Sequence, residues 1–225
     1  MPGRAFPLAT NEIYHIINKG VASQPTFLES KNYQRAVECL RYYQSKKPPI
    51  KYSRFLTLSN KRRGELFETL KKEKEFLVEI IAYCFMPNHF HLLVKQLTDN
   101  GISKFASNFT NSYTRYFNTK NERKGPLFQG RFKAKKIDTE EQLLHVARYI
   151  HLNPFSSFVA KSLKDLETYP HSSFPEYLNN DLSGFCSKEM IMNSFKNIET
   201  YKKFVFDQAH YQRELDKIKH LILEN

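Results

Sequence analysis

The sequence predicts an α+β protein of the ferredoxin-like type, in which an antiparallel sheet carries helices packed on one face. One observation is the order of the elements expected between residues 13 and 137: strand, helix, strand, strand, helix, strand, with one further charged helix. Composition is the other, because 40% hydrophobic residues with only 7 Gly and 10 Pro exclude a disordered or collagen-like chain. A chain of 225 residues is long enough to bury a substantial core.

The first elements are a strand and two helices. Residues 13–18 (IYHIIN) are rich in β-branched side chains, which is typical of a strand. Apolar residues recur at helical spacing from Ser30 to Gln44, and the run 46–49 (KKPP) ends that helix. Residues 60–74 predict a second, strongly charged helix.

A hairpin and a second strand-bearing segment follow. Residues 76–86 and 89–96 predict two strands, because both are apolar and a Pro-Asn turn separates them. Residues 102–118 predict a helix with a stripe of aromatic side chains. A strand is expected over 132–137, after a polar loop.

The C-terminal part of the chain has a different character. Helices are expected near residues 187–195 and 199–224, where we find no internal repeat and no familiar motif. We therefore divide the chain into a domain over residues 1–178 and a helical C-terminal extension of unassigned role over residues 179–225.

The net charge indicates an anionic partner for the first part of the chain. The sequence has 35 Lys and Arg against 23 Asp and Glu, a formal charge of +12. Residues 1–161 hold 27 basic and 13 acidic residues, a net of +14, whereas residues 162–225 hold 8 basic and 10 acidic residues, a net of −2. A basic body of this kind is typical of nucleic-acid-binding proteins, although charge alone does not identify the polyanion.

Cysteine usage and hydropathy predict a cytoplasmic protein with no membrane partner. The three cysteines are Cys39, Cys84 and Cys186, an odd number without metal-binding spacing. The first residues carry no hydrophobic signal segment. No apolar run approaches the roughly 18 residues that a membrane-spanning helix needs.

Two histidines at the start of the second hairpin strand form a candidate metal site. Alternation along a strand puts His89 and His91 on one face and Phe90 on the other. Two imidazoles on one face can share a divalent metal. The alternative is a structural histidine beside a solvent-facing one, and the pair alone does not decide between them.

A candidate nucleophile lies on the helix expected from about Glu140 to Asn153, where Pro154 stops the helix. His145, Tyr149 and Asn153 follow one another at spacings of four residues and share one face. A tyrosine hydroxyl can attack a phosphodiester, and an amide oxygen one turn away can bind a cation. The alternative is an amphipathic Tyr at the edge of the core and an Asn that ends the helix.

A basic segment lies between these two features in the sequence. Residues 115–136 contain eight basic residues and a single acid, a net of +7, with three phenylalanines interleaved. Cations neutralise phosphates and exposed aromatic rings stack on unpaired bases, so the segment is a candidate DNA-binding surface. Its basic residues are Arg115, Lys120, Arg123, Lys124, Arg131, Lys133, Lys135 and Lys136.

These motifs together resemble a known family. Residues 86–94 (MPNHFHLLV) resemble the HUH metal motif (His, hydrophobic, His) of the single-tyrosine transposases of the insertion-sequence 200 type. Residues 125–132 (GPLFQGRF) and 147–154 (ARYIHLNP) resemble their REP-associated branch, as do residues 14–20 (YHIINKG) and 169–173 (YPHSS). The order and spacing of the five motifs make the resemblance specific.

The resemblance covers roughly residues 13–178 and implies a domain that cleaves and rejoins single-stranded DNA, often beside a short hairpin. By position, His89 and His91 would hold a divalent metal, Mg or Mn. Tyr149 would attack the phosphate and form a 5′-phosphotyrosine intermediate. Asn153 stands where mobile-element relatives often carry a Gln ligand, so it is the candidate third ligand.

Several alternatives stay open at this point. Tyr113 and Tyr116 are rival nucleophiles, although their helix is expected to be a packing helix. The fold is also compatible with a catalytically silent DNA-binding protein or with an RNA-hairpin-binding protein. A small-molecule metallohydrolase is disfavoured, because it would leave the +7 segment unexplained. Relatives include both dimers and monomers, so a monomer and a homodimer are both compatible with the sequence.

Overall fold

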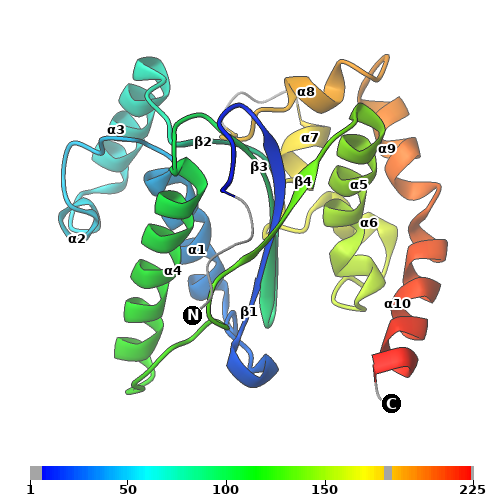
Figure 1. Cartoon of the computed structure of the whole chain (residues 1–225), viewed down its shortest axis with the longest axis horizontal. Helices are drawn as coiled ribbons and strands as arrows, with labels where there is room; N and C mark the ends of the chain where they lie inside the picture. Colours follow the sequence, from blue (N-terminus) through cyan, green and yellow to red (C-terminus); the bar gives the residue numbers. More distant parts are fainter. Residues whose placement is uncertain (1–6, 180–183, 224–225) are drawn as a thin grey trace.

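A four-stranded antiparallel sheet forms the centre of the molecule (Figure 1). The structure, a computed structural model, describes residues 7–179 and 184–223. The strands lie in the order β2-β3-β1-β4, which is the ferredoxin-like arrangement, so the predicted fold class is confirmed. The strands are β1 (Ile13–Lys19), β2 (Val78–Met86), β3 (His89–Gln96) and β4 (Lys133–Ile137).

Helices α1 (Ser30–Tyr43) and α4 (Gly101–Lys120) cover one face of the sheet (Figure 1). Side chains that alternate along β3, Phe90 and Leu92, pack there with aromatic residues of α4. Two helices that lie between α1 and β2 in the sequence, α2 (Tyr52–Phe55) and α3 (Asn60–Glu73), extend this layer outwards.

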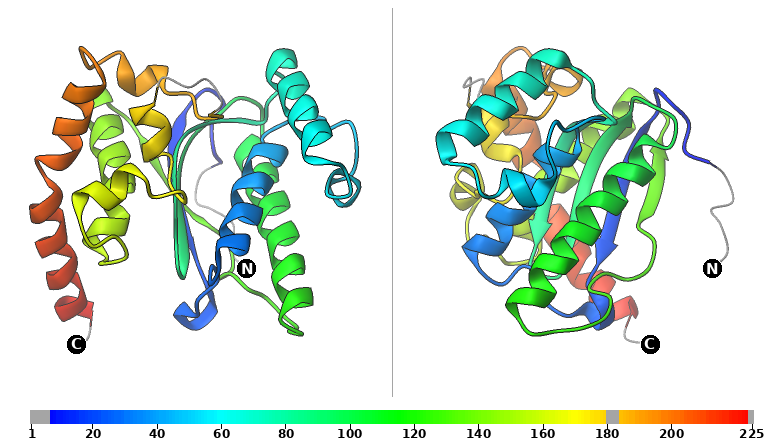
Figure 2. Two further views of the ribbon diagram at one scale, coloured as in Figure 1. Left: turned by 180° about the vertical axis from the view of Figure 1, so that it is seen from behind. Right: turned by 90° about the vertical axis from the view of Figure 1, so that its left-hand side faces the viewer.

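The opposite face is also covered, which the expectation of helices on one face did not include (Figure 2). Helix α5 (Glu140–Ser156) packs there through Leu143, Ala147 and Ile150. Leu93 of β3 contributes to the same apolar cluster. The physical reason is that β2 and most of β3 are buried on both faces, and strands of this kind must be covered on both sides.

The C-terminal helices complete the layer on the α5 side. They are α6 (Leu163–Glu167), α7 (Phe174–Leu178), α8 (Glu189–Met192), α9 (Ile198–Phe206) and α10 (Ala209–Leu223). Buried side chains of the segment after residue 178, including Ile191, Tyr201 and Val205, belong to the same core cluster as α5. The single helix expected over 199–224 is divided into two helices, α9 and α10. Its last residue and the first six residues of the expected domain lie outside the described residues.

The sequence predicts that Pro154 ends helix α5. In the structure the helix continues through Pro154 to Ser156. Proline removes one helical N–H, and the turn that follows is closed by other bonds. The Ser157 amide donates to the Asn153 carbonyl over 3.0 Å, and the Ala160 amide donates to the Pro154 carbonyl over 2.7 Å. None of the helices in the part of the chain that the structure describes is long and apolar enough to cross a membrane.

Candidate active site

The two histidines of the candidate metal site open β3 on the face that α5 covers. Strand β3 begins at His89, and the His89 and His91 rings meet edge to face with 5.0 Å between their centroids. Phe90 points to the opposite face, into the core with α4. The predicted alternation along this strand is confirmed.

A third histidine, which the sequence analysis did not select, supports the pair from β1. Nε2 of His15 lies 3.0 Å from Nδ1 of His91, and the two rings stack at 5.2 Å between centroids. The pairing of β1 with β3 sets Ile17 opposite His91, so His15 lies diagonally across the ladder. Alternation in residues 13–19 could have placed His15 on one face, but only the strand register brings it to His91.

Hydrogen bonds set the tautomers of the two candidate ligands. Nδ1 of His89 lies 2.6 Å from Oδ1 of Asn88, and an amide oxygen only accepts, so Nδ1 carries the proton. The lone pair of neutral His89 is therefore on Nε2. Nε2 of His91 faces the Nδ2 donor of Asn153, so its lone pair is likewise on Nε2 and its Nδ1 donates to His15.

Tyr149 and Asn153 of α5 reach the histidines, as their spacing on one helix face predicts. The Tyr149 ring lies edge to face against the His91 ring at 5.4 Å and against the His15 ring at 6.2 Å. Nδ2 of Asn153 lies 3.4 Å from Nε2 of His91. One chain therefore brings together the candidate nucleophile and all three candidate ligands. The rival Tyr113 is buried against α1 and donates to the Thr26 carbonyl, on the far side of the sheet.

Burial sets the protonation of the site at neutral pH. It lowers the pKa of His89 to about 4, with a further contribution from the positive charge of Lys19. Burial also lowers the pKa of His15 to about 4, helped by Lys135. The imidazoles of His89 and His15 are therefore neutral, the form in which an imidazole binds a metal. Burial, followed by the charge of Asp216, raises the pKa of the Tyr149 phenol, so the hydroxyl is protonated.

The donor set fits a divalent cation. Oδ1 of Asn153 is buried and makes no hydrogen bond of ordinary geometry to a described residue, although the Asn153 amide is close enough to His89 and Tyr149 to act on the pKa of both. The two imidazole nitrogens are donors typical of divalent transition metals, and the amide oxygen is a donor typical of Mg²⁺ and Mn²⁺. No third His, Cys, Asp or Glu joins the histidine pair as a metal-binding group within the described part of the chain. Asn153 is accordingly the candidate third donor; its Nδ2 faces Nε2 of His91, so binding through Oδ1 requires the amide to turn over.

A buried histidine fixes α5 in place beneath Tyr149. His151 is fully buried, with Nδ1 2.7 Å from the Tyr201 hydroxyl and Nε2 2.8 Å from the Ser173 hydroxyl. Ser173 in turn is hydrogen-bonded to the backbone of Tyr83 in β2. The segment that contains Ser173 therefore ties the helix that bears Tyr149 to the sheet.

Helix α10 brings further polar residues to the site, and the sequence analysis missed them. Gln212 donates to the Tyr149 carbonyl over 3.2 Å and to the Ser156 hydroxyl over 3.4 Å. One turn further on, the Asp216 carboxylate is close enough to act on the charge of both Tyr149 and His89. No motif around these residues pointed to the site, because only the packing of α10 on α5 places them there.

The central segment of the chain matches a known protein family. The family described as "Transposase IS200 like" matches residues 50–153. This segment belongs to the IS200-like transposases. A solved structure described as a REP-associated tyrosine transposase bound to a REP hairpin aligns with 79% of this chain and 85% of its own, at 15% sequence identity and a TM-score of 0.49. The comparison with curated proteins finds no match.

The IS200-like segment contains both histidines of the HUH motif, Tyr149 and Asn153. It begins in the loop between α1 and α2 and ends within α5. His15 lies before it, and Gln212 and Asp216 lie after it. The site of this chain therefore combines residues of the family segment with residues on both sides of it.

The basic residues of the IS200-like segment do not form one surface. Lys133 and Lys135 are exposed and point to the same face of β4 as Ile137, the face of the histidines. Lys135 and His15 line one cavity of about 250 Å³. Lys136 points away and pairs with Glu12 at 3.2 Å and Asp138 at 3.4 Å.

The remaining basic residues lie on α4 and its following loop. Arg115 and Lys120 are exposed on α4, on the other side of the sheet. Arg123 is bound within the loop, to the Asn118 side chain and the Pro126 carbonyl. Lys124 and Arg131 are exposed along the loop that leads from α4 to β4.

Proposed function

We propose that this protein is a metal-dependent nuclease and strand transferase that cleaves single-stranded DNA near hairpins through a 5′-phosphotyrosine intermediate. The observation that carries the proposal is the position of Tyr149, whose ring lies 5.4 Å from the ring of His91 of the HUH motif. A nucleophile and a cation site that are this close can act on one phosphate. The membership of residues 50–153 in the IS200-like family supports the same reaction class.

The step assigned to Tyr149 is an in-line exchange of phosphate esters. The Tyr149 oxygen attacks the scissile phosphorus and its phenolic proton leaves. The bond between phosphorus and the 3′ oxygen breaks, and that oxygen takes up a proton to become a free 3′-hydroxyl. Because one ester replaces another, a second 3′-hydroxyl can reverse the step and join strands.

Burial keeps Tyr149 protonated at neutral pH, so attack requires a proton acceptor. Asp216 is a carboxylate that acts on Tyr149 from α10, which makes it the candidate acceptor among the described residues. The sequence alone named no base, since the residue comes from outside the matched segment.

His89, His91 and Asn153 are the residues that would hold the cation. A divalent Mg or Mn ion bound there would neutralise charge that builds on the phosphate during attack. His15 orients His91 through its Nδ1, and such a partner on the far ring nitrogen makes the ligand more basic and fixes its direction.

The positive charges of β4 can bind a DNA strand beside the candidate active site. Lys133 and Lys135 are on the histidine face, on the edge strand of the sheet. They would neutralise phosphates on either side of the scissile bond. This arrangement favours single-stranded DNA as the substrate, because an extended strand can follow a sheet edge.

End-labelled DNA tests the proposed chemistry and its polarity. A hairpin oligonucleotide with single-stranded flanks is labelled at its 3′ end or its 5′ end and incubated with the full chain and Mn²⁺. We expect the 3′ label to become covalently attached to protein and the 5′ label to appear on a shorter free fragment. EDTA should abolish both products. Cleavage that leaves both labels on free DNA would contradict the tyrosine mechanism.

A further inference from the structure

A second cavity lies on the face of the sheet that does not carry Tyr149. It has a volume of about 780 Å³ and is formed by α1, α2 and α4. Four cations line it, Arg35, Lys51, Arg115 and Lys120, and no described Asp or Glu is among its lining residues. Lys120 is paired at 2.7 Å with Glu29, which lies outside the lining, so Arg35, Lys51 and Arg115 supply most of the positive charge. A cavity of this size can hold a nucleotide-sized ligand, and its charge favours an anion.

The floor of the cavity combines a cation with aromatic rings. The guanidinium of Arg35 lies 4.6 Å from the centroid of the Tyr52 ring and 5.1 Å from that of Tyr116. Nε of Arg35 is buried without a hydrogen-bond partner among the described residues. The Nε hydrogen is enclosed by the protein, so it is the positive charge of the guanidinium that favours an anion in the cavity.

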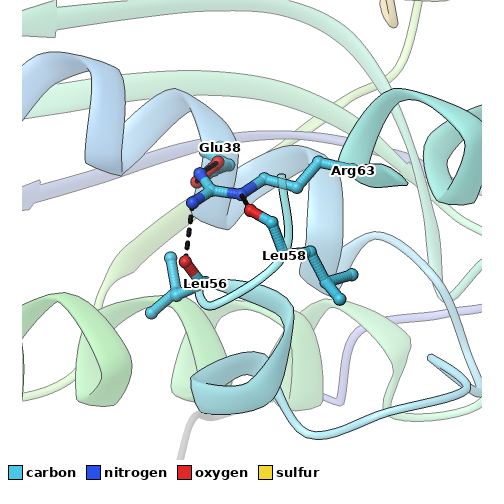
Figure 3. A network of polar contacts seen from close by, with 4 residues as sticks. All are labelled: Glu38, Leu56, Leu58 and Arg63. Atoms are coloured by element: carbon cyan, nitrogen blue, oxygen red, sulfur yellow. Dashed lines mark hydrogen bonds and ion pairs between the residues drawn. The ribbon is translucent and has the colours of Figure 1, made fainter. Parts of the chain in front are cut away.

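The wall formed by α2 is held by a network of its own (Figure 3). Arg63 of α3 donates to the carbonyls of Leu56 over 2.6 Å and Leu58 over 3.0 Å, and it pairs with Glu38 of α1 at 3.0 Å. The Tyr42 hydroxyl also donates to the Ile50 carbonyl. The cavity is therefore a built feature of the fold, with its outer wall fastened to α1.

Three exposed cations follow one another along the chain between this cavity and the histidine face of β4. Lys124 and Arg131 are exposed on the loop that leads from α4 to β4, and Lys133 is on the histidine face of β4. Figure 1 shows the path of this loop. Because β4 is an edge strand, a bound DNA strand can pass from one side of the sheet to the other around it.

From these observations we propose that the cavity between α1, α2 and α4 binds one unpaired nucleotide of the DNA substrate. Its base stacks on Tyr116 or Tyr43, the two half-buried tyrosines of the cavity, and its phosphate lies against Arg35 and Arg115. The identity of the substrate as DNA rests on the proposed function, whereas the site itself rests on the cavity.

Photo-crosslinking locates the nucleotide without any need for cleavage. The full chain, in EDTA, is bound to a hairpin DNA whose unpaired positions carry 5-iododeoxyuridine, one position at a time, and the crosslinked peptides are identified by mass spectrometry. We expect at least one position to crosslink to a tyrosine in residues 42–56 or 108–120. Crosslinks confined to β4, α5 and the histidines would overturn the proposal even if the protein nicks DNA.

Paired charge reversals provide the control. Arg115 and Lys61 are both exposed, and Lys61 lies on α3 away from the cavity lining. Arg115→Glu should lower the crosslinking yield and the affinity for the hairpin by about ten-fold, whereas Lys61→Glu should change them by less than about two-fold. Equal effects of the two variants would contradict a specific site. A matched RNA hairpin that crosslinks more strongly at the same tyrosines would replace DNA by RNA as the ligand.

Discussion

At the scale of single residues, the site depends on how the histidines support one another. The alternation that predicts His89 and His91 on one face needs only the sequence, because a strand fixes side-chain direction with a period of two. His15 could not be found in the same way. Its contact with His91 depends on the register between β1 and β3, which no local pattern encodes.

The His15 contact gives the first prediction. His15→Phe keeps a ring of similar size but removes the partner on Nδ1 of His91, so we expect the affinity for Mn²⁺ to fall by about 10- to 100-fold. Isothermal titration calorimetry with Mn²⁺ measures this. His145→Phe is the control, because His145 lies on the same side and bonds Arg148 rather than a candidate ligand. Equal affinities in the two variants would show that His15 has no role in orienting His91.

A second prediction concerns the buried His151, whose pKa burial lowers to about 3. Because the folded-state value lies below the unfolded value of about 6.5, neutral His151 stabilises the fold fully above pH 6.5, and this contribution is lost as the pH falls towards 3. Between pH 7 and pH 5, the wild type should lose about 2 kcal/mol more free energy of unfolding than His151→Gln.

Urea denaturation at the two pH values measures the difference. His210→Gln, on an exposed residue of α10, should keep the pH dependence of the wild type. If His151→Gln also kept it, the ring would not be held neutral by burial. The comparison uses the change with pH, so a general loss of stability in the variant does not affect it.

At the scale of elements, the long and strongly periodic segments were predictable and the short ones were not. Strand β3 begins and ends at the predicted residues, and α1, α3 and α4 differ from prediction by one or two residues at an end. Helices α2, α6 and α7 have four or five residues each, too few for a helical period to stand out. The contribution of α10 to the site also could not be predicted from the sequence, since it arises from packing against α5.

Arg213 of α10 holds this helix against α5, and its substitution tests that packing. Its guanidinium donates twice to the Phe155 carbonyl, at 3.0 and 2.8 Å, and lies 3.4 Å from the centroid of the Phe155 ring. Arg213→Ala should destabilise the docked α10 by about 1–3 kcal/mol. Hydrogen exchange should become faster in residues 209–216 while α5 stays protected. Tyr211→Ala, on an exposed position of the same helix, is the control, and equal exchange in both variants would contradict this role.

At the scale of the whole molecule, the basic charge is divided by the sheet. In the sequence, the +7 segment appeared to be one route between the two motifs. In the structure it splits, because alternation along β4 sends Lys133 and Lys135 to the histidine face while Arg115 and Lys120 remain on α4. Sequence distance cannot distinguish the two sides of a sheet, so the composition predicted an anionic partner but not its path.

The salt dependence of DNA binding tests this division. Lys133→Ala with Lys135→Ala removes two proposed phosphate contacts, so the slope of log affinity against log salt should become shallower by about 1.4. Fluorescence anisotropy with a labelled single strand measures it. Lys61→Ala with Lys72→Ala, two exposed residues of α3, should leave the slope unchanged. If the salt slope of the Lys133→Ala, Lys135→Ala variant equalled that of the wild type, β4 would not contact the DNA.

Tyr149, set against the histidine pair by α5, is the proposed nucleophile. The most direct measurement compares the wild type and Tyr149→Phe for a covalent adduct with 3′-labelled single-stranded DNA in Mn²⁺, with Tyr211→Phe as a matched control on an exposed tyrosine. We predict an adduct in the wild type and the control and none in Tyr149→Phe, with the labelled peptide mapping to α5. An adduct that persists in Tyr149→Phe would contradict the account.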